Sequence, residues 1–132
     1  MKCKEDSKGY KAGDIVMADN VGAHGNVQQG LRPFLIVSND IGNAVSPIYC
    51  AIPFTTRSKK CHQPTHCFFR AGEGGLQRSS ILLAEQITTL NKSDVLQKVG
   101  SFNEDQMRRA AMAVVTHIPM VSLAGGACNS PA

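Results

Sequence analysis

The stretch Gly30-Leu31-Arg32-Pro33-Phe34-Leu35-Ile36-Val37-Ser38-Asn39-Asp40 places one arginine at the entrance of an apolar strand. Phe34 to Val37 are apolar and rich in β-formers, and turn-forming residues bound them on both sides. Pro33 suits the first position of a strand, where no N–H is needed. Arg32 is therefore expected at the lip of a rigid element, where a functional group is held in place. A surface salt bridge is the alternative interpretation of this arginine.

Further segments on either side of this stretch have the composition of short strands. They cover residues 14–19, 48–55, 65–69, 80–88 and 95–102, and residues rich in Gly, Asn and Pro separate them. Pro53 predicts that the segment 48–55 lies at a sheet edge or carries a bulge. Residues 39–47 have the composition of a turn.

The last segment changes to helical spacing. Asn103 and Gln106 have the form of a capping box, and Pro119 ends the pattern. The expected buried face carries Met107, Ala110, Ala111, Val114, Val115 and Ile118. Short strands followed by one helix predict a mainly β fold, a small SH3-like antiparallel β-barrel with a C-terminal helix. We expect one domain at residues 12–118, a flexible leader at 1–11 and a disordered tail at 119–132.

Composition sets broad limits on function. The 132 residues carry 14 basic and 10 acidic side chains, a net charge of +4, which favours a polyanionic partner without requiring one. No apolar run reaches the roughly 18 residues of a membrane span, and residues 1–11 lack the apolar core of a signal peptide. These features predict a cytoplasmic protein without a membrane partner, whose five cysteines are reduced thiols.

One cluster of soft ligands resembles a metal site only superficially. Cys61-His62 and His66-Cys67 lie close together, but the Cys-x-x-Cys spacing of zinc fingers is missing. Adjacent residues also point to opposite sides of an extended chain. We therefore expect no metal and no other cofactor, and free thiols at both cysteines.

Several motifs in order along the chain resemble the MazF/PemK family. They are Gly13-Asp14-Ile15-Val16, Gly30-Leu31-Arg32-Pro33, Pro53-Phe54-Thr55-Thr56, Pro64-Thr65-His66 and Leu82-Leu83-Ala84-Glu85-Gln86-Ile87. The likeness runs from about Lys11 to Ile118. It implies a CcdB/PemK-type barrel and the toxin of a type II toxin–antitoxin system, a sequence-specific and metal-independent endoribonuclease acting on single-stranded mRNA. It further implies a homodimer, a cognate antitoxin with an acidic disordered segment, and DNA binding by the toxin–antitoxin complex.

The resemblance implies that Arg32 and Thr55 are the catalytic pair. RNA is cut without metal when its own 2′-hydroxyl attacks the adjacent phosphorus, which leaves a 2′,3′-cyclic phosphate and a 5′-hydroxyl. The enzyme must then stabilise charge on the non-bridging oxygens, and a guanidinium suits this with paired donors and a permanent charge. The Thr55 hydroxyl would add a donor worth about 3 kcal/mol. A β-branched residue that only favours the strand is the alternative for Thr55.

The sequence alone does not identify the residue that acts as general base. Members of the family often carry a glutamate in the loop before Arg-Pro, and here Val27 occupies that position. His24, His66 and Glu85 are the remaining candidates for acid and base. His66 ranks first, because histidine titrates in the useful range and the family uses this position near the RNA. A solvated surface histidine is the alternative.

The resemblance also implies a set of RNA-binding residues. Amide, hydroxyl and carboxylate groups could read the base edges of a splayed single strand. For Glu85, a structural salt bridge to Arg32 is the alternative. The basic residues 57, 59 and 60 are placed for phosphates, or form a solvated turn. The RNA-binding set is Asn26, Gln28, Thr56, His66, Ser80, Glu85 and Gln86.

Two other functions remain open on the sequence alone. A CcdB-like gyrase poison would share the fold, but such proteins act through a Trp-bearing C-terminal segment and this chain has no Trp. A catalytically weak relative could bind RNA or a protein partner without cutting, since Val27 cannot carry a proton. The fold alone does not decide between these functions.

Overall fold

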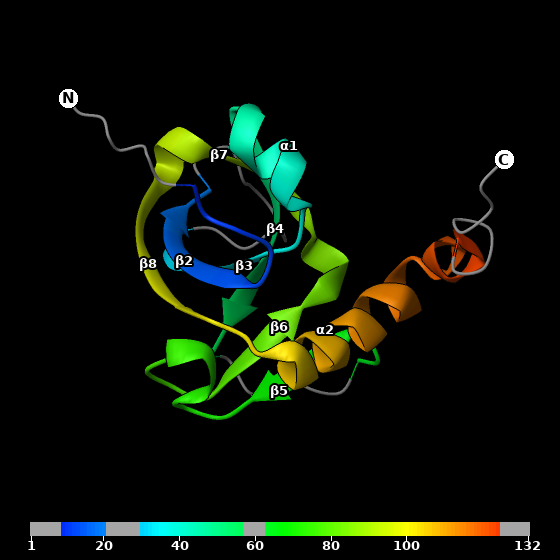
Figure 1. Ribbon diagram of the computed structural model, residues 1–132. Helices are drawn as coiled ribbons and strands as arrows, with labels where there is room; N and C mark the ends of the chain where they lie inside the picture. Colours follow the sequence, from blue (N-terminus) through cyan, green and yellow to red (C-terminus); the bar gives the residue numbers. More distant parts are fainter. Residues whose placement is uncertain (1–8, 21–29, 57–62, 125–132) are drawn as a thin grey trace, which may run out of the picture.

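The computed structural model describes residues 9–20, 30–56 and 63–124, and most of them belong to a curled antiparallel sheet with one long helix (Figure 1). The strands are β2 (Asp14–Asp19), β3 (Leu31–Ile36), β4 (Ile48–Thr55), β5 (His66–Phe69), β6 (Ser80–Leu83), β7 (Thr88–Asn91) and β8 (Val95–Ser101). The α-helices are α1 (Asp40–Val45) and α2 (Glu104–His117). Single 3₁₀ turns are η2 (Glu73–Gly75), η3 (Ala84–Gln86), η4 (Lys92–Asp94) and η5 (Pro119–Leu123).

The strands form one sheet in the order β5-β6-β4-β3-β2-β8, and β7 also pairs with β4. All of these pairs are antiparallel. The predicted mainly β fold with a C-terminal helix is confirmed, but the predicted closure into a barrel is wrong. Within the described residues no ladder joins β5 to β8, so the sheet curls without closing.

The central strand β4 corrects the prediction for Pro53. On one side β4 pairs with β3, and on the other its first half pairs with β7 and its last two residues with β6. Pro53 therefore lies inside the sheet rather than at an edge. Neither β7 nor β6 pairs with Ile52 or Pro53, so the missing N–H of proline falls where one ladder ends and the next begins.

Three boundaries also differ from the prediction. β3 begins at Leu31, so Pro33 is its third residue, and Arg32 lies within the strand opposite Ala18. The predicted strand 80–88 is broken by η3, because the chain turns where Ala84 N donates to Thr65 O (3.0 Å). The predicted turn at 39–47 contains α1, whose N-cap Asn39 accepts a hydrogen bond from Gly42 N (2.8 Å).

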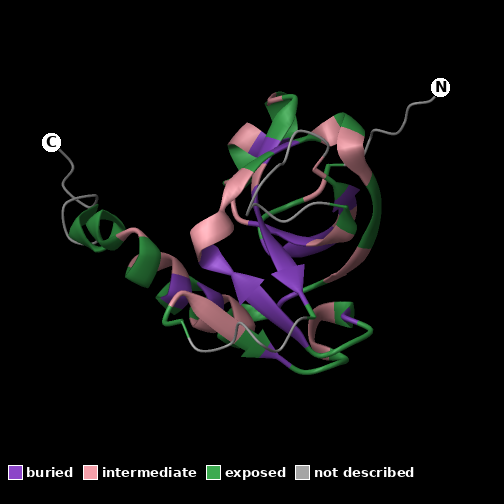
Figure 2. Ribbon diagram, turned by 180° about the vertical axis from the view of Figure 1, so that it is seen from behind, coloured by how far each residue is buried: buried purple, intermediate pink, exposed green. Residues whose placement is uncertain are grey.

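Alternation along the central strands separates two apolar clusters, because successive side chains point to opposite faces. The first cluster contains Ile15, Leu35, Ile52, Phe54, Phe69, Leu76, Leu82, Phe102 and Ala110. The second contains Val16, Ala18, Phe34, Ile36, Tyr49, Ala51 and Leu90. β2, β3 and β4 contribute to both, so the centre of the sheet is buried on both faces (Figure 2).

Helix α2 begins as predicted. Asn103 Oδ1 accepts from Gln106 N and Gln106 Oε1 accepts from Asn103 N, both at 2.8 Å, which completes the capping box. Ala110 and Ala113 are buried, and Met107 and Val114 pack against the first cluster. Ala111, expected on the buried face, is exposed, whereas Ala113 was not predicted. Residues 119–123, expected in the tail, form η5. No described helix is long and apolar enough to cross a membrane.

The η2 turn and strand β8 meet backbone to backbone. A Cβ at Gly75 would lie 2.5 Å from Val99 O, and a Cβ at Gly100 would collide with Gly74 O. Gly75 also has φ of +85°, where side chains are strained. Only glycines at these positions let η2 lie directly against β8.

Candidate functional site

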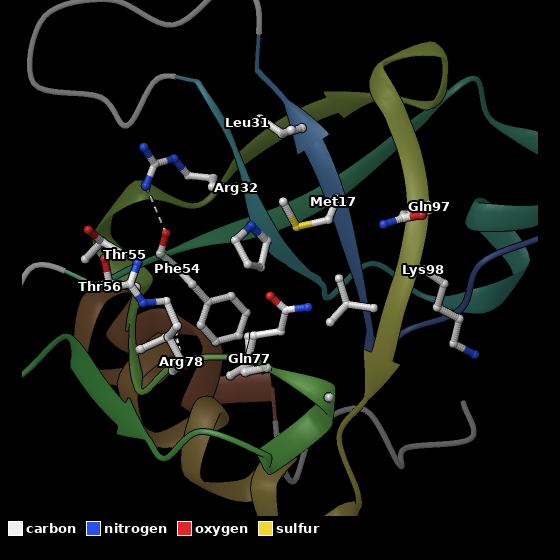
Figure 3. A pocket seen from close by; sticks show the side chains of 15 residues that line it. Met17, Leu31, Arg32, Phe54, Thr55, Thr56, Gln77, Arg78, Gln97 and Lys98 are labelled. Atoms are coloured by element: carbon white, nitrogen blue, oxygen red, sulfur yellow. Dashed lines mark hydrogen bonds between the residues drawn. The ribbon is translucent and has the colours of Figure 1, made fainter.

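A groove of about 640 Å³ opens where β3, β4 and β8 meet the segment that follows η2 (Figure 3). Its lining comes from distant parts of the chain, and the close approach of η2 to β8 holds two of its walls together. The lining residues are Met17, Leu31, Arg32, Pro33, Phe54, Thr55, Thr56, Gly75, Leu76, Gln77, Arg78, Ser80, Gln97, Lys98 and Val99.

Arg32 and Thr55, the predicted catalytic pair, both line this groove. Arg32 extends from β3, and its Nη1 donates to Phe54 O at 3.1 Å. Phe54 precedes Thr55 at the end of β4, so this bond ties the guanidinium to the strand end that carries the threonine (Figure 3). The alternative of Arg32 as a purely surface group does not fit this half-buried position.

Thr56 and Ser80, from the predicted RNA-binding set, line the same groove. Thr56 follows β4 and is exposed, whereas Thr55 and Ser80 are buried. Ser80 Oγ donates to Arg78 O (2.8 Å), so this hydroxyl also fixes the turn before β6. Thr55 pairs with Ile81, the residue after Ser80, which places both hydroxyl residues at the same end of the β4–β6 ladder.

The groove carries positive charge that sequence reasoning missed. Arg78 extends toward Thr55 and Thr56, whereas Lys98 points away from the centre of the groove (Figure 3). Lys98 Nζ lies 3.4 Å from Asp14 Oδ1, so its charge is partly compensated. The described lining contains no Asp, Glu or His. The available signal was weak: Gln77-Arg78 is a polar pair just before the expected strand 80–88, and Gln97-Lys98 is a polar pair within the expected strand 95–102.

His66 and Glu85 form a separate cluster that does not line the groove. His66 Nε2 donates to Glu85 Oε2, and Thr65 Oγ1 donates to Glu85 Oε1, both at 2.8 Å. The His66 side chain is only 2% exposed, so the interpretation of a solvated histidine is wrong. Because Glu85 binds His66 and Thr65 and forms no ion pair with Arg32, the alternative of an Arg32–Glu85 salt bridge is also wrong.

Two opposing effects act on the pKa of Glu85. Burial raises the pKa of its carboxyl, but hydrogen bonds from His66, Thr65 and its own backbone outweigh burial and lower the pKa below the ordinary value. His66 pairs with Leu83 and Thr55 with Ile81, two residues apart on β6. His66 and Thr55 therefore face the same side of the sheet, although His66 lies two strands away. Gln86 follows in η3 and is half-buried.

Several predicted residues lie outside the described ranges: His24, Asn26, Val27, Gln28, Arg57, Lys59, Lys60, Cys61 and His62. Among residues 9–20, 30–56 and 63–124, no three His, Cys, Asp or Glu side chains gather into a set that could hold a metal ion. Within the same ranges Cys50 and Cys67 are free, and burial raises the pKa of both thiols.

Two known proteins are similar in sequence to most of this chain. Endoribonuclease EndoA of Bacillus subtilis is 32% identical over 111 residues, 84% of this chain and 96% of that protein. Endoribonuclease MazF of Staphylococcus saprophyticus is 33% identical over 104 residues, 79% of this chain and 87% of that protein.

Solved structures share the fold. The crystal structure of MazF (Form-I) from Deinococcus radiodurans superposes with a TM-score of 0.72 at 24% identity, covering 84% of this chain and 97% of that one. An endoribonuclease in complex with its cognate antitoxin from Mycobacterial species gives 0.66 at 22% identity, covering 85% and 95%. The model of the PemK-like, MazF-like toxin of type II toxin–antitoxin systems matches residues 11–118, and this chain therefore belongs to that family.

Proposed function

We propose that this protein is the toxin of a type II toxin–antitoxin system and cuts single-stranded mRNA as a sequence-specific, metal-independent endoribonuclease. The observation that carries the proposal is the placement of Arg32 and Thr55 in one groove, linked through the carbonyl of Phe54. Membership in the toxin family and two relatives named endoribonucleases support it.

The geometry suits in-line attack by the 2′-hydroxyl of RNA. The bond to Phe54 O limits rotation of the Arg32 guanidinium, which presents N–H donors in a planar fork. A phosphate bound there would have its non-bridging oxygens stabilised as charge develops on them. Thr55 would supply a neutral donor, and Arg78 a second positive charge on the same side of the groove (Figure 3).

The products follow from this chemistry. The 2′-oxygen bonds to phosphorus as the bond to the 5′-oxygen breaks, leaving a 2′,3′-cyclic phosphate and a 5′-hydroxyl. The 2′-hydroxyl loses a proton and the leaving 5′-oxygen gains one. The described lining holds no carboxylate or imidazole, and the candidates for the proton acceptor are His24, which lies outside the described residues, His66 and Glu85.

Partners follow from the same groove. An acidic, disordered antitoxin segment would fold across the basic groove and exclude RNA from it. We further propose a homodimer with RNA bound along the dimer groove, acting in the cytoplasm where mRNA is available. Solved relatives include an endoribonuclease with its cognate antitoxin and a MazE–MazF complex, which supports the antitoxin as a partner.

A ribonuclease assay with EDTA tests the proposal. The wild type is expected to cut a long RNA at defined sites mapped by primer extension, with cyclic phosphate at the 3′ ends. Thr55→Val, which keeps the shape of the side chain, should slow cutting by about 100-fold. Intact RNA that is still retained by the protein would instead indicate a binding protein. Intact RNA together with inhibited DNA supercoiling would indicate a gyrase poison.

A further inference from the structure

The groove extends well beyond Arg32 and Thr55, to an end lined by two glutamines. Met17 pairs with Pro33 on one side and with Gln97 on the other, so these three side chains form one row across β3, β2 and β8. Two strand spacings separate Pro33 from Gln97, about 10 Å. Gln77 reaches the same region from the segment after η2, with its amide pointing toward Met17 (Figure 3).

The floor of this end is apolar. Ile15 and Leu35 belong to the first cluster, and Met17 and Pro33 lie two residues further along the same strands on the same face. Leu76 and Val99 also pack in or against that cluster, and both line the groove. The floor is therefore the uncovered edge of the core, a surface suited to a flat apolar ring.

The amide groups above this floor have no partner within the described part of the chain. Gln77 and Gln97 are exposed, and neither side-chain amide forms a hydrogen bond with another described residue. An amide offers both a donor and an acceptor, the pattern that reads base edges. Proteins recognise single-stranded bases by apolar contact with the ring and by hydrogen bonds to its edge. Two amides over an apolar floor offer both kinds of contact.

The charges argue against a second phosphate at this end. The charge of Lys98 is partly compensated by Asp14, and the side chain points away from the centre of the groove (Figure 3). Arg78, by contrast, extends toward Thr55 and Thr56 at the opposite end. Positive charge therefore gathers where the scissile phosphate would lie, and the neutral hydrogen-bonding groups of Gln77 and Gln97 lie at the other end of the groove.

We propose that this end of the groove is a nucleobase subsite, in which Gln77 and Gln97 determine the base accepted beside the scissile phosphate. The inference rests on the proposed function, because it assumes that RNA occupies the groove. The base lies on Met17, Pro33 and Val99, and its polar edge exchanges hydrogen bonds with the two amides. Neither glutamine takes part in the bond-breaking step.

The test is cleavage of a random-sequence RNA pool, with the ends of the products sequenced. Gln97→Met and Gln77→Met keep side-chain length and remove the amide. Each is expected to reduce discrimination among bases at one position near the cut by about tenfold or more. Cleavage of the RNA with the least favoured base should change little, because that RNA gains nothing from the amides.

Two further variants serve as controls. Gln63→Met makes the same change at an exposed glutamine outside the groove and should keep the wild-type preference. Lys98→Met changes a lining side chain that points away from the centre of the groove and carries no amide, so it should also keep the wild-type base preference. Melting temperatures of all variants show that each is folded.

The possible failures are distinct. If both glutamine variants keep the wild-type preference at every position, or slow all sequences equally, the subsite is wrong while the proposed function stands. If the wild type leaves the whole pool intact, the proposed function is wrong and the subsite falls with it.

Discussion

The guanidinium of Arg32 is positioned by the backbone of a neighbouring strand. Its Nη1 donates to Phe54 O at 3.1 Å, and the next residue on that strand is Thr55. A carbonyl acceptor inside a sheet cannot move without disturbing the ladder, so the orientation of the arginine depends on the sheet itself. A charge on a flexible stem would lose this alignment.

Arg32→Lys should therefore lose about 100-fold or more in kcat although the positive charge is kept. Single-turnover cleavage at saturating protein measures this loss without the contribution of binding. Arg108→Lys, on the exposed face of α2 in an ion pair with Glu104, is the matched control and should cut like the wild type. Near-normal cleavage by Arg32→Lys would remove the catalytic role of the guanidinium.

The histidines are expected to differ in the pH dependence of cleavage. If His24 is the base, the rate rises with pH through an apparent pKa of about 6.5, the ordinary histidine value. His24→Ala should flatten that rise. His66→Ala should keep it, because His66 is buried against Glu85 outside the groove, and should lower the melting temperature instead. A flattened profile in His66→Ala alone would return the role of base to His66.

Sequence reasoning singled out Arg32, Thr55, Thr56 and Ser80, and these four line one groove, because each lies on or directly beside a strand whose position the motifs fix. It missed Arg78, Gln77 and Gln97. Their inclusion depends on the contact between η2 and β8, which joins residues far apart in sequence. It also missed that His66 binds Glu85, since a hydrogen-bonded pair between two strands leaves no local pattern.

At the scale of elements, Glu73 joins the η2 turn to helix α2. Its carboxylate accepts from Arg70 N (2.8 Å), from Arg109 Nη1 (2.9 Å) and from Gln106 Nε2 (3.2 Å). The hydrogen bond from the Arg70 backbone, followed by those from Gln106 and Arg109, lowers the pKa of Glu73 against the opposing effect of burial. Gln106 thus caps helix α2 and also binds Glu73 in the η2 turn.

Glu73→Gln should lower the melting temperature at pH 7, with a loss that shrinks in acid. A carboxyl whose folded pKa is depressed stabilises the fold above its unfolded pKa, and that stabilisation fades as the pH falls through the folded value. Melting curves from about pH 3 to 7 should therefore converge at low pH. Glu104→Gln, at the exposed start of α2, serves as the comparison and should differ little from the wild type. A constant gap at all pH values would contradict the linkage.

Helix α2 offers a second test. Val114 packs against the first cluster, whereas Met112 is 69% exposed. Val114→Asp should destabilise the fold by about 2–4 kcal/mol, since it places an unpaired charge against apolar side chains. Met112→Asp introduces the same charge and should cost less than about 1 kcal/mol. Urea unfolding measures both, and equal losses would mean that the buried face is misassigned.

Element types followed from the sequence more reliably than element boundaries. The capping box fixed the start of α2, because its two hydrogen bonds are local. The strand predicted at 80–88 was wrong, because β propensity does not reveal the bond from Ala84 to Thr65 that turns the chain. The expected barrel failed for the same reason: whether a sheet closes depends on pairing between distant strands.

For the molecule as a whole, the width of the groove depends on the two glycines at which η2 contacts β8. Gly75 and Gly100 let η2 lie on β8, and these elements carry two walls of the groove. Gly100→Ala should force them apart, costing about 1–3 kcal/mol and widening the groove. We expect a lower melting temperature and weakened base preference. Gly42→Ala, where a Cβ would meet only Asn39 Oδ1 at 3.6 Å, is the control. An unchanged preference in a folded Gly100→Ala protein would show that the walls do not set selectivity.

The change of partner along β4 has a consequence for how the protein opens. β4 pairs with β3, β6 and β7, and it supplies Ile52 and Phe54 to one cluster and Tyr49 and Ala51 to the other. Neither cluster can lose this strand without exposing the other, so the two are expected to melt in one cooperative transition. Arg32 and Thr55 stand on β3 and on β4 itself. Local opening of loops and strand ends would therefore leave Arg32 and Thr55 aligned. The site should be lost only when the whole protein unfolds.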